Sequence, residues 1–96
     1  MAIVRFKHKG LRDLFENGAS RHVAPALHAK SILILDLLNH ARSPSVCRGS
    51  FDFHPLKGDR QGEWSMHVNG PWCITFEWDA QGDVTVNDLE NYHGDD

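Results

Sequence analysis

Apolar and polar side chains alternate along much of the second half of the chain. The alternation covers residues 51–54, 64–69, 72–78 and 84–86. A period of two is typical of β-strands that bury one face and leave the other open. The pairs Asn69-Gly70 and Gln81-Gly82 separate the later runs and are typical of tight hairpin turns. This half of the chain therefore predicts an antiparallel meander.

The first half of the chain shows helical periodicity instead. A short strand is expected at residues 3–6, followed by a helix over residues 8–17 that Gly18 ends. Pro25 suits the first turn of a second helix, which is expected to run to about Ala41. A strand, two helices and a meander together predict a single α+β domain.

The second predicted helix is apolar on more than one side. On a helical wheel, the expected core stripe consists of Leu27, Ile34, Leu37, Leu38 and Ala41. Ile32 and Leu35 fall on the other side, among polar residues. Two explanations remain open: another element of this chain covers these two residues, or they form a surface for a partner protein.

Length and composition fit one soluble domain. The chain has 96 residues, of which 41% are hydrophobic, and residues 1–96 are expected to share one core. No apolar run approaches the length of a membrane helix, and the first residues lack the apolar stretch of a signal peptide. Cys47 and Cys73 form neither a disulfide framework nor a zinc-ligand spacing. We therefore expect a cytoplasmic protein with reduced thiols, no metal and no membrane contact.

Charge is distributed unevenly over a chain whose net charge is −3. Residues 1–48 hold eight Lys/Arg and three Asp/Glu, a net +5, whereas residues 49–96 hold two Lys/Arg and ten Asp/Glu, a net −8. Nucleic-acid binding by a basic surface is therefore expected of the first half only. The charge pattern alone equally fits an ordinary solvated surface.

Two histidines fall on the open side of the predicted sheet. If the aromatic and aliphatic residues of each strand point inward, His54 and His67 point outward. A short loop at residues 69–71 would then set His67 opposite Cys73 on the next strand.

Histidine, lysine and tyrosine side chains that converge on one face suit RNA cleavage without a metal ion. Lys57 follows the first of these histidines in a loop, and Tyr92 and His93 follow the last strand. In this reaction the 2′-hydroxyl of the RNA attacks the adjacent phosphate. Imidazole can accept and donate the protons, and a cation stabilises the charge on phosphorus. Tyr92 also offers a ring on which a base can stack. Taken singly, a histidine at a strand end or a lysine in a loop is most often an ordinary surface residue, and Tyr92 and His93 equally fit a role in covering the edge of the core.

Several short blocks of sequence, in a fixed order along nearly the whole chain, form a recognisable pattern. They are residues 6–11, 14–18, Pro25 with 28–30, 54–60, 62–65, 68–72, 74–76 and Tyr92-His93. In this order the blocks resemble HigB-type killer proteins of the RelE/ParE toxin superfamily. The resemblance implies a RelE-like fold: an N-terminal strand, two helices packed on an antiparallel meander sheet, and a short C-terminal helical turn. It also implies an endoribonuclease that cleaves mRNA on the ribosome, and a HigA-like helix-turn-helix antitoxin through which operator DNA is bound.

The resemblance and the charge pattern together assign roles to individual residues. His54 and His93 are implied to transfer the protons, and Lys57 to stabilise the charge on phosphorus. Asn91 and Tyr92 complete the implied catalytic set, and no cofactor is expected. The residues expected to bind partners are Arg5, Lys7, Lys9, Arg12 and His67 for RNA, and Ile32 and Leu35 for the antitoxin.

The chain departs from the family pattern in ways that bear on catalysis. Family members usually have Arg where this chain has His67 and Cys73, and Asp where it has Asn91. They also have a more basic second helix and a basic chain overall. Each difference weakens RNA binding or transition-state stabilisation. An alternative function is therefore a RelE-fold module that binds its antitoxin and has weak or no catalytic activity.

Overall fold

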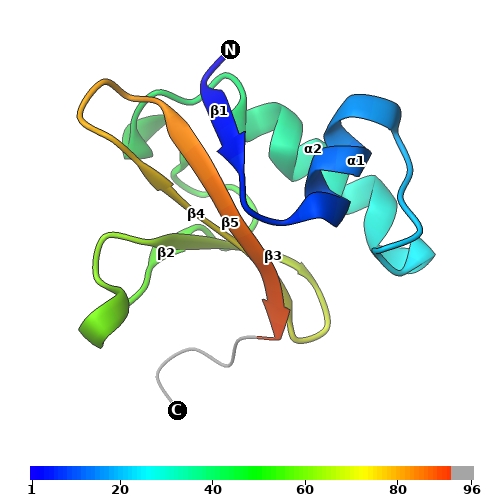
Figure 1. The fold of residues 1–96 in the computed structure, drawn as a ribbon. Coiled ribbons are helices and arrows are strands. Elements are labelled where there is room, and N and C mark those ends of the chain that lie inside the picture. Colours follow the sequence, from blue (N-terminus) through cyan, green and yellow to red (C-terminus); the bar gives the residue numbers. More distant parts are fainter. Residues whose placement is uncertain (92–96) are drawn as a thin grey trace.

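The structure, a computed structural model, describes residues 1–91 as a sheet with helices on one face (Figure 1). The strands are β1 (Ile3–Phe6), β2 (His54–Pro55), β3 (Trp64–Asn69), β4 (Trp72–Trp78) and β5 (Val84–Asn91). Their order in the five-stranded sheet is β1-β5-β4-β3-β2. The predicted antiparallel meander is confirmed for β2 to β5. Because β1 joins it parallel to β5, the sheet is mixed.

The helices α1 (Lys9–Asn17) and α2 (His28–Leu38) lie together on one side of the sheet (Figure 1). The imidazole of His8 caps α1 by accepting a hydrogen bond from a backbone N–H of the first turn. Gly18 ends this helix, as predicted, with a left-handed φ of 79°. α2 follows a 3-10 turn that Pro25 begins, and it ends slightly before the predicted position. Neither described helix has the length and hydrophobicity that crossing a lipid bilayer requires.

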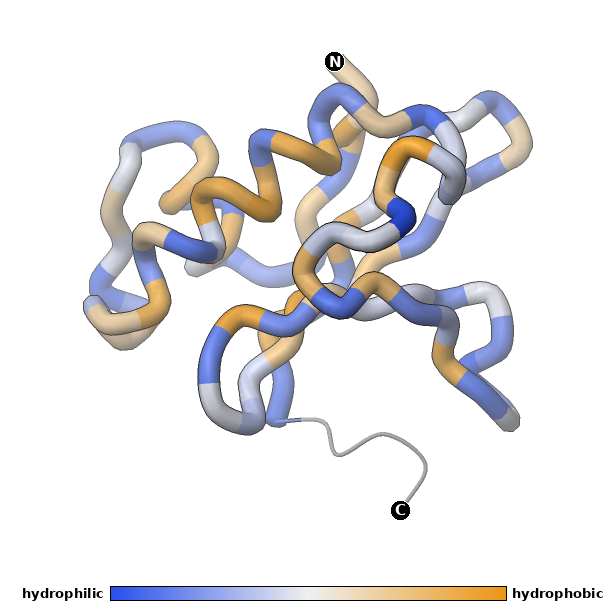
Figure 2. The backbone as a smooth tube through the Cα atoms, turned by 180° about the vertical axis from the view of Figure 1, so that it is seen from behind, coloured by the Kyte–Doolittle hydropathy of each residue, from blue (hydrophilic) through white to orange (hydrophobic). Residues whose placement is uncertain are grey.

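α2 is buried on more than one side, which corrects one expectation. Leu35 is 0% exposed, because α1 and the sheet both pack against this helix. Ile32 is half-buried against the core, whereas Leu33 is 59% exposed. Figure 2 shows that much of this helix is apolar, with hydrophilic residues between the apolar ones. Leu35 is therefore a core residue, and the expectation that it lies on an uncovered side of the helix is wrong.

The strand expected over residues 51–54 is largely replaced by a turn. Phe51 and Asp52 have φ angles of 51° and 54°, in the left-handed region that residues other than glycine rarely adopt. β2 therefore begins only at His54. Phe53 nevertheless packs against the core, where its ring stacks on that of Trp64 with centroids 4.7 Å apart.

The register between β3 and β4 is the one that the sequence predicts. Met66 pairs with Ile74 and His67 pairs with Cys73 across the hairpin. The short C-terminal helical turn expected after Asn91 lies outside the described residues.

Candidate functional site

The face of the sheet that points away from the helices carries several of the polar residues singled out in the sequence. Its side chains are those of His54 on β2, Ser65 and His67 on β3, Cys73 and Thr75 on β4, and Glu90 on β5. We call this set the polar face.

The polar face is less accessible than the alternating pattern predicts. Ser65 and Thr75 are 0% exposed and Cys73 is 7% exposed. The segment after β2 folds back toward this face, because Leu56 is buried and a side chain from the following 3-10 turn reaches β5. Within this set, His54, His67 and Glu90 are half-buried, so the polar face is accessible only in part.

The two cysteines are free, as expected from the sequence. Both are also buried, which was not expected for Cys73, because the alternating pattern places it on the open face of the sheet. Burial raises the pKa of Cys47 to about 11. Burial also raises the pKa of Cys73, although a hydrogen bond with Ser65 acts in the opposite direction. Both thiols are therefore protonated at neutral pH. Within residues 1–91, no three His, Cys, Asp or Glu side chains are grouped as they would be around a metal ion.

His54 is held at both ring nitrogens. Its Nδ1 lies 2.7 Å from the backbone carbonyl oxygen of Asp52, and its Nε2 lies 3.3 Å from the hydroxyl of Ser65. Because a carbonyl oxygen only accepts hydrogen bonds, Nδ1 carries the proton of the neutral ring and Nε2 carries the lone pair. The side chain is 40% exposed. This imidazole is therefore both oriented and accessible.

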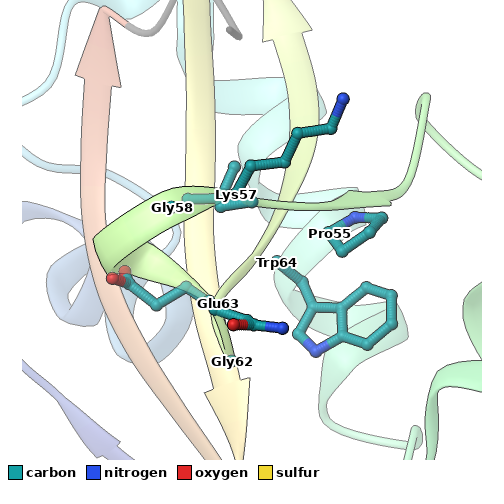
Figure 3. Close-up of a pocket in the computed structure, with 8 residues that line it drawn as sticks. Pro55, Lys57, Gly58, Gly62, Glu63 and Trp64 are labelled. Carbon is teal, nitrogen blue, oxygen red and sulfur yellow. The ribbon is translucent and has the colours of Figure 1, made fainter.

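A cavity of about 480 Å³ lies between the two arms of the segment that joins β2 to β3. It is lined by Pro55, Leu56, Lys57, Gly58, Gln61, Gly62, Glu63 and Trp64. Figure 3 shows the Lys57 side chain extending away from Glu63, and the indole of Trp64 beside Pro55. Lys57 is thus an exposed cation three residues after His54, at the same edge of the sheet.

A cluster of ionised side chains beside the polar face was not expected from the sequence. Arg60 donates to Glu90 at 2.6 and 2.8 Å and to Glu63 at 2.9 and 3.2 Å. These hydrogen bonds lower the pKa of both carboxyl groups. The amide of Asn87 extends the cluster by donating to Glu63 at 3.1 Å and to Glu77 at 2.8 Å. His54 and these carboxylates all come from residues 49–96, the half of the chain with a net negative charge. The uneven charge along the sequence therefore does not keep acidic side chains away from the proposed catalytic residues.

Two other predicted site residues lie differently from expectation. The Nε2 of His67 donates to the carbonyl oxygen of Gly70 at 2.7 Å, which ties this ring to the β3–β4 turn. Asn91 pairs with Trp72, whereas the preceding residue pairs with Cys73 of the polar face. Because successive strand residues point to opposite faces, Asn91 is not on the polar face. Tyr92 and His93 lie outside the described residues.

The basic residues expected to bind RNA are exposed at the far edge of the sheet. They are Arg5 on β1, Lys7 after it, and Lys9 and Arg12 on α1. β1 and β2 form opposite edges of the sheet, and four strand spacings correspond to about 19 Å. Lys57 and His54 therefore lie at the same edge of the sheet, and the basic residues of the first half lie at the opposite edge.

A mixed sheet with two helices on one face, in this strand order, is the fold of RelE-like toxins. The solved structure of a YoeB/ParE toxin from Agrobacterium tumefaciens matches it with a TM-score of 0.63 over 97% of this chain and 100% of that chain, at 20% sequence identity. This likeness confirms the predicted fold. The sequence then specifies the family.

Residues 4–93 match the model of the HigB-like toxin family, described as the RelE-like toxin of the type II toxin-antitoxin system HigB. The chain belongs to this family, and the resemblance predicted from the sequence blocks is confirmed. The protein named Endoribonuclease HigB from Proteus vulgaris is 41% identical over 93 residues, which cover 95% of this chain and 99% of that protein. Membership in a type II toxin family implies an antitoxin partner.

Proposed function

We propose that this chain is a ribosome-dependent endoribonuclease that cleaves mRNA through attack of the RNA 2′-hydroxyl, without a metal ion. The observation that carries the proposal is the oriented, 40% exposed imidazole of His54, three residues before the exposed Lys57. The name of the Proteus vulgaris relative, Endoribonuclease HigB, supports the same reaction class.

The proposed reaction needs two proton transfers and one cation. The 2′-oxygen bonds to the adjacent phosphorus, a 2′,3′-cyclic phosphate forms, and the bond from phosphorus to the 5′-oxygen breaks. His54 and His93 exchange the two protons, and Lys57 stabilises the negative charge on phosphorus. Tyr92 supplies a ring for base stacking. Asn91, which is not on the polar face, is left out of the proposed catalytic set.

Cleavage of mRNA on purified ribosomes tests this proposal. His54→Ala and His93→Ala should each lower the cleavage rate about 10²- to 10⁴-fold, which is the usual contribution of a general acid or base. His40→Ala is a matched control, because the exposed His40 ring also contacts a backbone carbonyl through Nδ1, at 2.8 Å, but lies after α2. Products should end in a cyclic phosphate and a 5′-hydroxyl. A 5′-phosphate product, or wild-type cleavage by His54→Ala, would contradict the proposal.

The proposed partners are the ribosome with its mRNA and a HigA-like helix-turn-helix antitoxin, in the cytoplasm. Operator DNA would be bound only through the antitoxin. RNA contact is proposed for Arg5, Lys7, Lys9, Arg12 and His67. Antitoxin contact is proposed for α2 through the half-buried Ile32. Its predicted companion Leu35 is left out, because it is fully buried.

A second candidate function is a RelE-fold module that binds the antitoxin with weak or no catalysis. The pairing of Arg60 with two carboxylates favours it, because a guanidinium already neutralised by Glu63 and Glu90 contributes less to phosphate binding. The mRNA cleavage assay, combined with a measurement of antitoxin binding, separates the two functions. Tight antitoxin binding with no cleavage by the wild-type chain would establish the second.

A further inference from the structure

A strained turn lies two residues before His54 in the sequence. Phe51 and Asp52 both adopt left-handed φ angles, although neither is glycine. Such conformations are unfavourable and persist only where the surroundings hold them. Here the Phe51 ring packs against the core, with the amine of Lys30 on α2 5.9 Å from its centre.

The turn directs two backbone carbonyls toward histidines. The carbonyl oxygen of Phe51 accepts from the backbone N–H of His67 at 2.7 Å, which fixes the turn to β3. The next carbonyl oxygen, that of Asp52, lies 2.7 Å from Nδ1 of His54. The carboxylate of Asp52 is farther from the same nitrogen, at 4.0 Å. The backbone carbonyl, rather than the charged side chain, is therefore the main partner of this ring nitrogen.

A buried hydroxyl holds the other nitrogen of the same ring. Ser65 is 0% exposed and pairs with His54 across β2 and β3, so its hydroxyl is placed by the sheet register. It lies 3.3 Å from Nε2, which is longer than a strong hydrogen bond. A hydroxyl can donate to the neutral ring and accept from the protonated one, so this contact survives a change in the protonation state of His54.

We propose that the Phe51–Asp52 turn and Ser65 are positioning elements that keep the proton of neutral His54 on Nδ1 and make Nε2 the atom that takes up a proton during cleavage. The inference rests on the proposed function. An RNA hydroxyl that approaches Nε2 displaces the long contact with Ser65 only until the proton is transferred, after which the protonated Nε2 donates to the Ser65 hydroxyl. The Ser65 hydroxyl retains a second partner in the thiol of Cys73, so its displacement leaves no buried group unpaired.

Nitrogen-15 NMR of the imidazole rings in the free full-length chain tests the tautomer directly. The spectrum should show a protonated Nδ1 and an unprotonated Nε2 for His54. Asp52→Asn should give the same pattern, because asparagine keeps the backbone carbonyl, tolerates a left-handed φ and removes only the charge. Protonation of neutral His54 at Nε2 in the wild type overturns the inference, and so does loss of the Nδ1 proton in Asp52→Asn.

Kinetics on ribosome-bound mRNA test the role of Ser65. Ser65→Ala should lower kcat about 2- to 10-fold with KM unchanged, the equivalent of one neutral hydrogen bond. It should also shift the His54 Nε2 resonance. Ser31→Ala is the matched control, because Ser31 is equally buried, lies on α2 and has no hydrogen-bond partner for its hydroxyl within the described chain. An unchanged kcat and Nε2 resonance in folded Ser65→Ala overturn the role of Ser65.

The outcomes separate this inference from the proposed function. If His54→Ala cleaves at the wild-type rate while the ring carries its proton on Nδ1, the catalytic role of His54 is wrong and the orientation of the ring is right. If His54→Ala is inactive while Nε2 carries the proton, the proposed function stands and the positioning inference falls.

Discussion

Replacement of Arg60 by methionine should destabilise the chain by about 2 kcal/mol at neutral pH. The change leaves Glu63 and Glu90 partly buried without their shared donor. Hydrogen bonds to charged groups contribute roughly 1.5–3 kcal/mol. The three side chains are 31%, 23% and 19% exposed, so solvent screening reduces the upper part of that range. For a domain of this size, about 2 kcal/mol corresponds to a fall in Tm of about 10 °C.

The effect should depend on pH with a definite sign. Arg60 lowers the pKa of Glu63 and of Glu90 in the folded chain below the value in the unfolded chain, about 4.3. The folded state therefore binds fewer protons, and the stabilisation is fully present above that unfolded pKa. It is lost as the pH falls through the lower folded pKa of each group. The difference between wild type and Arg60→Met should accordingly shrink well below 1 kcal/mol near pH 2.

Urea unfolding followed by tryptophan fluorescence at pH 7 and at acidic pH measures both effects. Arg42→Met is the control, because Arg42 donates to Asp83 at 2.8 Å but is 56% exposed, a position where ion pairs contribute less than about 1 kcal/mol. The reasoning is refuted if Arg60→Met is no more costly than Arg42→Met at pH 7, or if its cost is the same at both pH values.

Three further predictions follow from burial, backbone conformation and exposed charge. Leu35→Ala should cost about 2–5 kcal/mol in urea unfolding, because it removes a fully buried side chain, and a cost under 0.5 kcal/mol would contradict its place in the core. Gly18→Ala should cost about 1 kcal/mol by the same assay, because the helix ends there with a φ of 79°. Replacement of Arg5 and Arg12 by Gln should flatten the salt dependence of ribosome binding, and an unchanged slope would place RNA contact elsewhere.

Local sequence signals predict the β-meander but not the turn that orients His54. The β3–β4 register follows from strict alternation and a short turn after Asn69, so the pairing of His67 with Cys73 is accessible from sequence. The turn at Phe51 and Asp52 carries no glycine to indicate a left-handed backbone. Tertiary contacts hold that conformation, through packing of the Phe51 ring and the hydrogen bond from His67 to the Phe51 carbonyl, and a local pattern contains no information about either contact.

A contact between residues distant in the sequence and a bulge in β5 account for the other differences. Arg60 and Glu90 are thirty residues apart, and their contact depends on how the segment after β2 folds back toward β5. Asn91 leaves the polar face because β5 has a bulge at Asn87, which has no partner in register on β4. The one sequence trace of this bulge is that the inward-facing Val86 and Leu89 are three residues apart instead of two.

The positions of the basic residues and of His54 constrain how a single RNA can meet both. They occupy opposite edges of the sheet, about 19 Å apart, so a phosphate bound by Arg5 or Lys7 is not the phosphate beside His54. Counterion release depends on how many phosphates are contacted, not on whether the cleaved bond is among them. The basic edge can therefore raise the affinity for ribosome or RNA without touching the reacting atoms. Because the strands between the two edges are fully buried at Thr75, Phe76 and Val86, the sheet fixes this separation, and binding should be separable from chemistry.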